Sequence, residues 1–156
     1  MEHTSLLGDF GSKRIKDQAL LIARILLAML FLKFGWAKLN DYSGTLSYMA
    51  ATGVPLPVVA AIVAIIIEFF GAIALILGLW TRPLAILLVV YTFATACIGH
   101  QYWSEMGADH LADMTNFYKN ISIMGGFLLL YVTGAGKWSI DAQLGLTGSG
   151  IALTEK

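Results

Sequence analysis

Four long stretches of the sequence are almost entirely hydrophobic, and each has the length that a helix needs to cross a lipid bilayer. They cover roughly residues 18–39, 57–79, 84–100 and 117–134. The segment Thr81-Arg82-Pro83 between the second and third stretches is long enough only for a turn between antiparallel helices. The pattern therefore predicts an all-α fold, an integral membrane four-helix bundle with up-down-up-down topology.

The predicted bundle accounts for most of the chain and leaves no room for a separate soluble domain. We expect an N-terminal tail at residues 1–17, a transmembrane domain at residues 18–142 and a C-terminal tail at residues 143–156. The two connections opposite the termini mix hydrophobic with polar residues. Residues 40–56 predict a short helix on the membrane surface, and residues 102–116 predict an amphipathic lid.

Composition agrees with a membrane protein, whose partner is the lipid bilayer. Hydrophobic residues make up 58% of the chain and charged residues only 13%, whereas charged residues form about a quarter of a typical soluble domain. The net charge is zero, which argues against a nucleic-acid partner. Basic residues gather at the termini and in the second connection, at Lys13, Arg14, Lys16, Arg82, Lys137 and Lys156. The opposite connections are mainly acidic, so the positive-inside rule predicts that both termini are cytoplasmic.

Glu68 is the only ionisable residue in the second hydrophobic stretch, residues 57–79. At a rise of about 1.5 Å per residue it lies about 16 Å from either end, near the middle of the bilayer. Ionisable groups at this depth are costly and are usually functional. Helical spacing places Ala61, Ala64 and Ala72 on the same face, and small residues let helices pack closely. We therefore predict that Glu68 faces the other helices.

Arg24 on the first helix is the predicted partner of Glu68. It is expected about 6–8 Å to the cytoplasmic side of Glu68, within reach of a long side chain, and a guanidinium stays charged when it is desolvated. Lys33 lies a similar distance to the outer side, but it can extend to the membrane surface instead. Two interpretations of the pair remain open. Arg24 and Glu68 are either a catalytic pair that handles charge or protons, or a structural pair that holds two helices together.

A second polar cluster is predicted at the outer membrane face. Lys38 ends the first helix, His100 ends the third, and Lys119 and Asn120 begin the fourth. Antiparallel topology brings these four residues to one depth, and Trp36 lies near the rim. Together they suit the binding of an anionic or quinone-like ligand. The alternative is that they are ordinary interfacial residues that reach toward water.

We expect no metal site. Glu105, Asp109, His110 and Asp113 have helical spacing, but acidic residues on a loop outside the membrane need no metal to explain them. His100 has neither a CxxCH motif nor an evident second axial ligand beside it. Haem or flavin is therefore a weaker candidate cofactor than a quinone.

Four sequence motifs resemble those of the DoxX family. They are Arg24 followed by FLKFGWAKL at residues 31–39, EFFG at 68–71 followed by LGLWTR at 77–82, KN at 119–120, and GAGKWSID at 134–141. Their order matches the predicted helices, and the resemblance covers about residues 18–142. The chain is most similar to the small, stand-alone DoxX-like proteins of the bacterial inner membrane.

The resemblance implies a four-helix protein of the bacterial inner membrane, associated in some members with quinone-linked oxidation. One branch of the family is the membrane subunit of a thiosulfate:quinone oxidoreductase, and others accompany responses to redox stress or aromatic compounds. No thiosulfate-oxidising domain is recognisable in this chain. The family's motif positions correspond here to Arg24, Gly35, Lys38, Glu68, Gly71, Asn120 and Asp141.

Three functions fit these features. The first is a component of a quinone-linked or aromatic/redox-stress membrane oxidoreductase system that binds a small quinone-like or anionic ligand near the outer face. An electron-donating oxidoreductase partner would then be needed unless haem or flavin binds, so it stays open whether the chain alone is an enzyme. The second is a small-solute or proton-coupled transporter, which would need a homo-oligomer because four helices are few. The third is a non-catalytic membrane assembly subunit.

Overall fold

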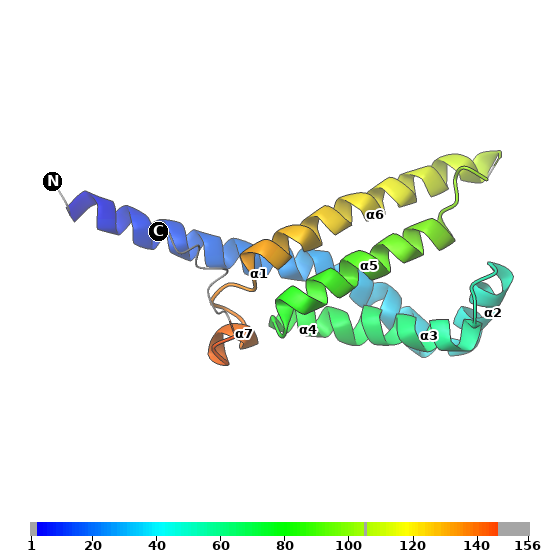
Figure 1. Cartoon of the computed structure of the whole chain (residues 1–156), viewed down its shortest axis with the longest axis horizontal. Coiled ribbons are helices and arrows are strands. Elements are labelled where there is room, and N and C mark those ends of the chain that lie inside the picture. The colour runs from blue at the N-terminus through cyan, green and yellow to red at the C-terminus, as the bar shows by residue number, and fades with distance from the viewer. Residues whose placement is uncertain (1–2, 105, 147–156) are drawn as a thin grey trace, which may run out of the picture.

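The computed structural model describes residues 3–104 and 106–146, and every regular element in these ranges is a helix. The elements are α1 (His3–Asn40), α2 (Tyr42–Ala51), α3 (Pro57–Ile65), the π-helical turn η1 (Ile66–Gly71), α4 (Ala72–Leu77), α5 (Thr81–Gly99), α6 (Ala108–Thr133) and α7 (Ile140–Gln143) (Figure 1). The prediction of an all-α protein is therefore confirmed for the described residues.

Within the described residues, three helical rods are long and apolar enough to cross a membrane. They are Ile15–Asn40 of α1, Pro57–Leu77 from α3 through α4, and Thr81–Gly99 of α5. Helix α6 has 26 residues but is not among them, because its first half is rich in polar residues and no stretch of the helix is both long and apolar enough. The structure thus supports an integral membrane protein, and the fourth predicted span corresponds to the C-terminal part of α6.

Two segments are more helical than the hydrophobic pattern predicts. Residues 3–17, expected as a tail, extend α1 to a length of 38 residues. Residues 108–116, expected as part of a lid, form the first turns of α6. Helix α2 agrees with the short helix expected between residues 40 and 56. Residues 147–156 of the predicted C-terminal tail lie outside the described residues.

Local sequence explains where several helices begin and end. Asp41 caps α2, because its side chain accepts a hydrogen bond of 2.9 Å from the backbone N–H of Gly44. Pro57 occupies the first turn of α3, where its missing N–H costs nothing. Gly78 ends α4 with φ of +68°, a left-handed conformation that favours glycine. Ser139 caps the short helix α7 with its hydroxyl.

The helices form two layers that meet at one end of the molecule. The rod of α3, η1 and α4 packs antiparallel against α1, and α5 and α6 form a hairpin of two adjacent helices (Figure 1). The hairpin meets the other layer near α4 and diverges from it toward α2 (Figure 1). The core lies where the layers meet and includes Ala28, Leu75, Leu88, Phe127 and Leu130.

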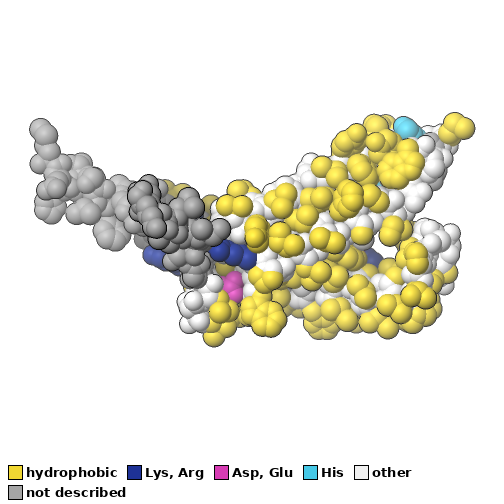
Figure 2. Space-filling model, viewed as in Figure 1, with side chains coloured by type: hydrophobic (Ala, Val, Ile, Leu, Met, Phe, Trp, Pro, Cys, Tyr) yellow, Lys and Arg dark blue, Asp and Glu magenta, His cyan; other side chains and the backbone are white. Residues whose placement is uncertain are grey.

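The outer surface of the helices is mainly hydrophobic, as expected for contact with lipid tails. Figure 2 shows hydrophobic side chains over most of the visible face. In the same view, charged side chains gather near the end that carries α7 and in the gap between the diverging layers (Figure 2). On this face, the charged side chains of the described residues thus lie apart from the broad hydrophobic surface (Figure 2).

Helix α1 approaches the π-helical turn very closely at Gly35. A Cβ atom on Gly35 would lie 2.5–2.8 Å from backbone atoms of Glu68 and Phe69, well inside van der Waals contact. Glu68 is only 8% exposed, which confirms that it faces the other helices. Three buried alanines lie on the same rod: Ala61, Ala64 and Ala72. Small residues thus allow the two backbones to approach each other.

We expect Gly35→Ala to lower the free energy of unfolding by about 1–3 kcal/mol, because the added methyl group forces the two backbones apart. Denaturant unfolding of the purified protein in detergent micelles measures this change. Gly125→Ala is the matched control, since Gly125 lies in α6 with no neighbouring atom within 4 Å of the new methyl group. This control should be neutral or slightly stabilising. Equal destabilisation by both substitutions would contradict a special contact at Gly35.

Candidate functional site

The diverging layers enclose a cavity of about 740 Å³ at the end of the molecule near α2. Helices α1, α2, α3, α5 and α6 and the turn η1 all contribute to its wall. Much of the wall is hydrophobic, with Phe31, Phe34, Val63 and Ile98 among its side chains. Small organic ligands occupy pockets of roughly 300–1,000 Å³ in proteins, so this cavity has a suitable size. Its few polar side chains then determine what it can bind.

Glu68 is the centre of the polar floor of this cavity, which consists of Lys38, Glu68 and Tyr91. Oε2 of Glu68 lies 2.6 Å from Nζ of Lys38, and Oε1 accepts a hydrogen bond of 2.6 Å from the hydroxyl of Tyr91. All three side chains line the cavity. A carboxylate alone at this depth would be costly, and here a cation and a phenol compensate it.

Three separate helical segments bring the polar floor together. Lys38 lies about one turn beyond Gly35 on α1, so the close contact at Gly35 holds Lys38 beside η1. Tyr91 comes from the middle of α5. Glu68 lies in the π-helical turn itself, and such turns are rare and frequently occur at functional sites.

Thr92 adds an unpaired hydroxyl to the cavity wall. Its side chain is 1% exposed and lines the cavity, and its Oγ1 has no hydrogen-bond partner among the described residues. Most buried hydroxyl groups in proteins have a partner. The unpaired Oγ1 of Thr92 therefore marks a position where a bound molecule could accept or donate a hydrogen bond.

The structure brings four of the predicted ligand residues into this cavity. Lys38, His100, Lys119 and Asn120 all line it, together with Glu68. The sequence predicted Glu68 and the outer polar cluster as two separate groups. In the structure both line one cavity, and Lys38 of the cluster contacts Glu68. Their role in ligand binding stays a prediction.

Neighbouring polar groups orient the outer residues of the cavity. Nδ1 of His100 lies 3.1 Å from Oδ1 of Asp113. Nζ of Lys119 donates a hydrogen bond of 2.7 Å to Asn116. Both contacts connect the cavity wall to the first turns of α6, which the hydrophobic pattern had placed outside the helix.

Trp36, the fifth predicted ligand residue, does not line the cavity. Its ring packs against Phe69 with centroids 5.7 Å apart, and its side chain is 56% exposed. Two residues along a helix correspond to a rotation of about 200°, so Trp36 and Lys38 lie on different faces of α1. The structure therefore does not bring Trp36 together with the other four residues.

The predicted pair of Arg24 and Glu68 is wrong. Arg24 is fully buried, but its guanidinium donates hydrogen bonds to the backbone carbonyls of Ile76, at 3.1 Å, and of Trp138. The reason is the register of the helices. Gly35 is level with Glu68, and Arg24 lies eleven residues earlier on α1, about 16 Å away along the helix. Arg24 does not line the cavity near α2, so it lies outside the candidate ligand site.

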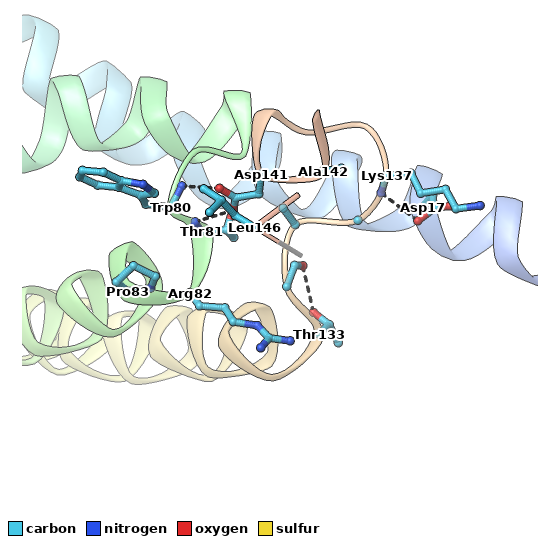
Figure 3. Close-up of a pocket in the computed structure, with 13 residues that line it drawn as sticks. Asp17, Trp80, Thr81, Arg82, Pro83, Thr133, Lys137, Asp141, Ala142 and Leu146 are labelled. Carbon is cyan, nitrogen blue, oxygen red and sulfur yellow. Dashed lines mark hydrogen bonds between the residues drawn. The ribbon is translucent and has the colours of Figure 1, made fainter. Parts of the chain in front are cut away.

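Arg24 belongs instead to a polar group at the α7 end. Asp141 accepts hydrogen bonds from the backbone N–H groups of Trp80, at 2.7 Å, and Thr81, at 2.8 Å, and so caps the start of α5 (Figure 3). The negative charge of Asp141 also acts on Arg24. Gly78 leaves no space for a Cβ atom beside the guanidinium. These groups together hold the turn between α4 and α5.

Tyr91 and Thr92 are site residues that hydrophobic segment length alone does not reveal. Their signal in the sequence is a pair of polar side chains near the middle of an otherwise hydrophobic stretch, at a depth similar to that of Glu68. Tyrosine in membrane helices is enriched at the interfaces, so a tyrosine at mid-span is informative.

An aromatic cluster covers the connection between α5 and α6. Tyr102 packs against four rings with centroids 5.3–6.0 Å away, those of Trp103, His110, Phe117 and Tyr118. A hydrogen bond with Tyr118 raises the pKa of the Tyr102 hydroxyl.

In the part of the chain that the structure describes, no three His, Cys, Asp or Glu side chains group as metal ligands would, and Glu105 lies outside that part.

Comparisons with known proteins agree with the sequence motifs. The family model described as DoxX matches residues 19–101, just over half of the chain. Inner membrane protein YphA of Escherichia coli (strain K12) is 48% identical over 135 residues, covering 86% of this chain and 95% of that protein. Inner membrane protein YqjF of the same strain is 42% identical over 135 residues, covering 85% of this chain and 96% of that protein. No solved structure gives a significant match.

We expect Asp141→Ala to lower the free energy of unfolding by about 2–4 kcal/mol, because α5 loses its cap and Arg24 loses its counter-charge. Thermal unfolding in detergent measures the change. Asp17→Ala is the control at the same end, since Asp17 accepts a hydrogen bond from the backbone N–H of Lys137 near the surface. It should cost about 1 kcal/mol or less. If the two substitutions cost the same, Asp141 is no more than a surface contact.

Proposed function

Because the chain belongs to the DoxX family, we propose that it is a ligand-binding component of a membrane oxidoreductase system that holds a quinone-like or anionic aromatic ligand in the cavity near α2. The observation that carries this proposal is the polar floor of Lys38, Glu68 and Tyr91 inside a largely hydrophobic cavity. Hydrophobic walls suit an aromatic ring, and a few polar groups at one end suit the oxygen atoms on that ring.

The side chains of the cavity fit the head group of a quinone, whose carbonyl oxygens accept hydrogen bonds. Lys38, Thr92 and Lys119 are donors on the wall, and Oγ1 of Thr92 has no other partner in the described part of the chain. When bound, a quinone would supply two-electron, two-proton redox chemistry, with electrons delivered by a partner oxidoreductase. The donors of this chain would hold and orient the ring.

Glu68 would handle protons at this site. Lys38 and Tyr91 each hold one oxygen of its carboxyl group, which fixes the orientation of that group in the cavity wall. The ammonium group of Lys38 offsets the negative charge when Glu68 is ionised. This assignment replaces Arg24 with Lys38 as the cation of the pair.

We also propose that α6 crosses the membrane as a fourth helix and that both termini face the cytoplasm. Helix α6 lies along α5, and α7 lies at the same end of the molecule as the N-terminal half of α1 (Figure 1). Arg82 and Lys137 lie at that end, and basic residues favour the cytoplasmic side. Relatives named as inner membrane proteins of Escherichia coli support a bacterial inner membrane location.

We expect Lys38→Met to weaken the binding of a water-soluble quinone analogue by about 10- to 100-fold, the effect of losing one charged hydrogen bond. Titration calorimetry of the purified protein in detergent measures the affinity. Lys33→Met is the matched control, because Lys33 is an exposed lysine on the same helix that does not line the cavity. It should bind as tightly as the unmodified protein.

Thr92→Val distinguishes a binding defect from a folding defect. Loss of an unpaired buried hydroxyl should leave the free energy of unfolding unchanged or raise it, whereas ligand affinity should fall severalfold. The proposal is overturned if the unmodified protein binds neither quinone analogues nor aromatic acids. It is also overturned if Lys38→Met and Lys33→Met bind alike.

We expect Glu68→Gln to reduce quinone-dependent electron transfer in membrane vesicles by about a hundredfold or more, because glutamine keeps the shape of the side chain but cannot exchange a proton. Unfolding in detergent provides the control that the variant is folded. Full activity and an unchanged cellular phenotype in a folded Glu68→Gln variant would instead identify a non-catalytic assembly subunit.

A further inference from the structure

A second cavity lies at the opposite end of the molecule, beside α7 (Figure 3). It has a volume of about 400 Å³. Its wall comes from residues 80–83 at the start of α5, residues 133–137 at and after the end of α6, and the side chains of Asp17, Asp141, Ala142 and Leu146. None of these residues lines the cavity near α2, so the two sites are separate.

The two carboxylates in this wall already have hydrogen-bond partners. Both oxygens of Asp141 accept hydrogen bonds from backbone N–H groups at the start of α5. Oδ1 of Asp17 accepts the backbone N–H of Lys137 at 3.1 Å, as the dashed line in Figure 3 shows. The hydrogen bonds that the structure gives these carboxylates thus go to backbone N–H groups and not to the cations of the cavity.

The two cations in the wall, Arg82 and Lys137, have no such partners among residues 3–104 and 106–146. Arg82 forms neither a hydrogen bond nor an ion pair with any described residue, and it lies half-buried beside the end of α6. Its Nε would be 3.5 Å from a Cβ atom on Gly134, and Figure 3 shows the guanidinium extending toward Thr133. The side chain of Lys137 is exposed at the edge. Positive charge is thus available inside the cavity.

Thr81 provides a second, independent observation. It is 0% exposed, it lines the cavity, and its Oγ1 has no hydrogen-bond partner in the described ranges. Thr81 is the first residue of α5, so no preceding helical carbonyl is available to its hydroxyl. A hydroxyl and a guanidinium that line one cavity, both without a partner among the described residues, are potential donors to an oxyanion.

We propose that this cavity binds a phosphate group through Arg82, with Thr81 and Lys137 as further donors. A guanidinium matches phosphate with two parallel hydrogen bonds. Trp80 and Trp138 are 67% and 52% exposed at this end, and exposed tryptophans lie at the level of lipid head groups. An anionic phospholipid and a soluble phosphate ester share this chemistry, and the tryptophans favour the lipid.

Native mass spectrometry of the full chain in detergent tests the proposal, with phosphatidylglycerol and phosphatidylcholine of identical acyl chains in competition. We expect the unmodified protein to retain phosphatidylglycerol preferentially. Arg82→Gln should reduce this retention about fivefold, because one basic residue near an anionic lipid contributes about 1 kcal/mol. Lys16→Gln is the matched control, since Lys16 is an exposed cation on α1 outside the cavity wall. It should retain phosphatidylglycerol normally.

Thr81→Val should reduce retention without lowering the unfolding temperature, which separates ligand binding from folding. A parallel titration with inorganic phosphate distinguishes the two possible sources of the phosphate group, an anionic phospholipid and a soluble phosphate ester. Arg82-dependent binding of inorganic phosphate without a preference for phosphatidylglycerol would support a soluble phosphate ester and overturn the lipid source. Absence of binding by both probes, or equal loss in Arg82→Gln and Lys16→Gln, would overturn the phosphate site itself.

Discussion

The backbone contact between Gly35 and the π-helical turn sets the register of the first two membrane-spanning rods. This register places Lys38 beside Glu68 and Arg24 beside the turn at Gly78. A shift of one helical turn, about 5.4 Å, would separate each charge from its partner. Charges inside a membrane tolerate such separation poorly, because no water is present to replace the lost partner. One steric constraint thus determines the electrostatics of α1.

The same register divides the buried polar residues of α1 between two different tasks. Arg24 and Lys38 lie 14 residues apart, about 21 Å along the helix. Arg24 donates to backbone carbonyls, which cannot change their protonation, so its contacts hold the fold in one state. Lys38 contacts Glu68, which in turn contacts Tyr91, so the partner of Lys38 is a side-chain carboxyl group and not a backbone carbonyl. The chemistry of the partners, rather than burial alone, separates the structural end from the candidate functional end.

Hydrophobic segments predicted the membrane-crossing rods and the inward orientation of Glu68, because both depend on local spacing along one helix. They also predicted that Lys38, His100 and the start of α6 would meet, since antiparallel helices of similar length align their ends. The partner of Glu68 could not be predicted in this way. The ends of the hydrophobic stretches indicate only roughly how deep each residue lies in the membrane. The actual offset of α1 along the rod of α3, η1 and α4 depends on where a glycine permits contact between the two backbones. Trp36 does not line the cavity for a related reason. Its closeness to Lys38 in the sequence does not place the two side chains on the same face of α1.

The hydrogen bond from Arg24 to the carbonyl of Trp138 has a consequence for biosynthesis. These two residues are 114 positions apart, so one contact of α1 depends on an acceptor that the ribosome makes much later than Arg24 itself. Until that segment is made, the guanidinium lacks one of its two carbonyl acceptors, and the surrounding lipid cannot replace it. The final position of α1 must therefore be reached after Trp138 has been made, so this contact of α1 forms late in the assembly of the helices.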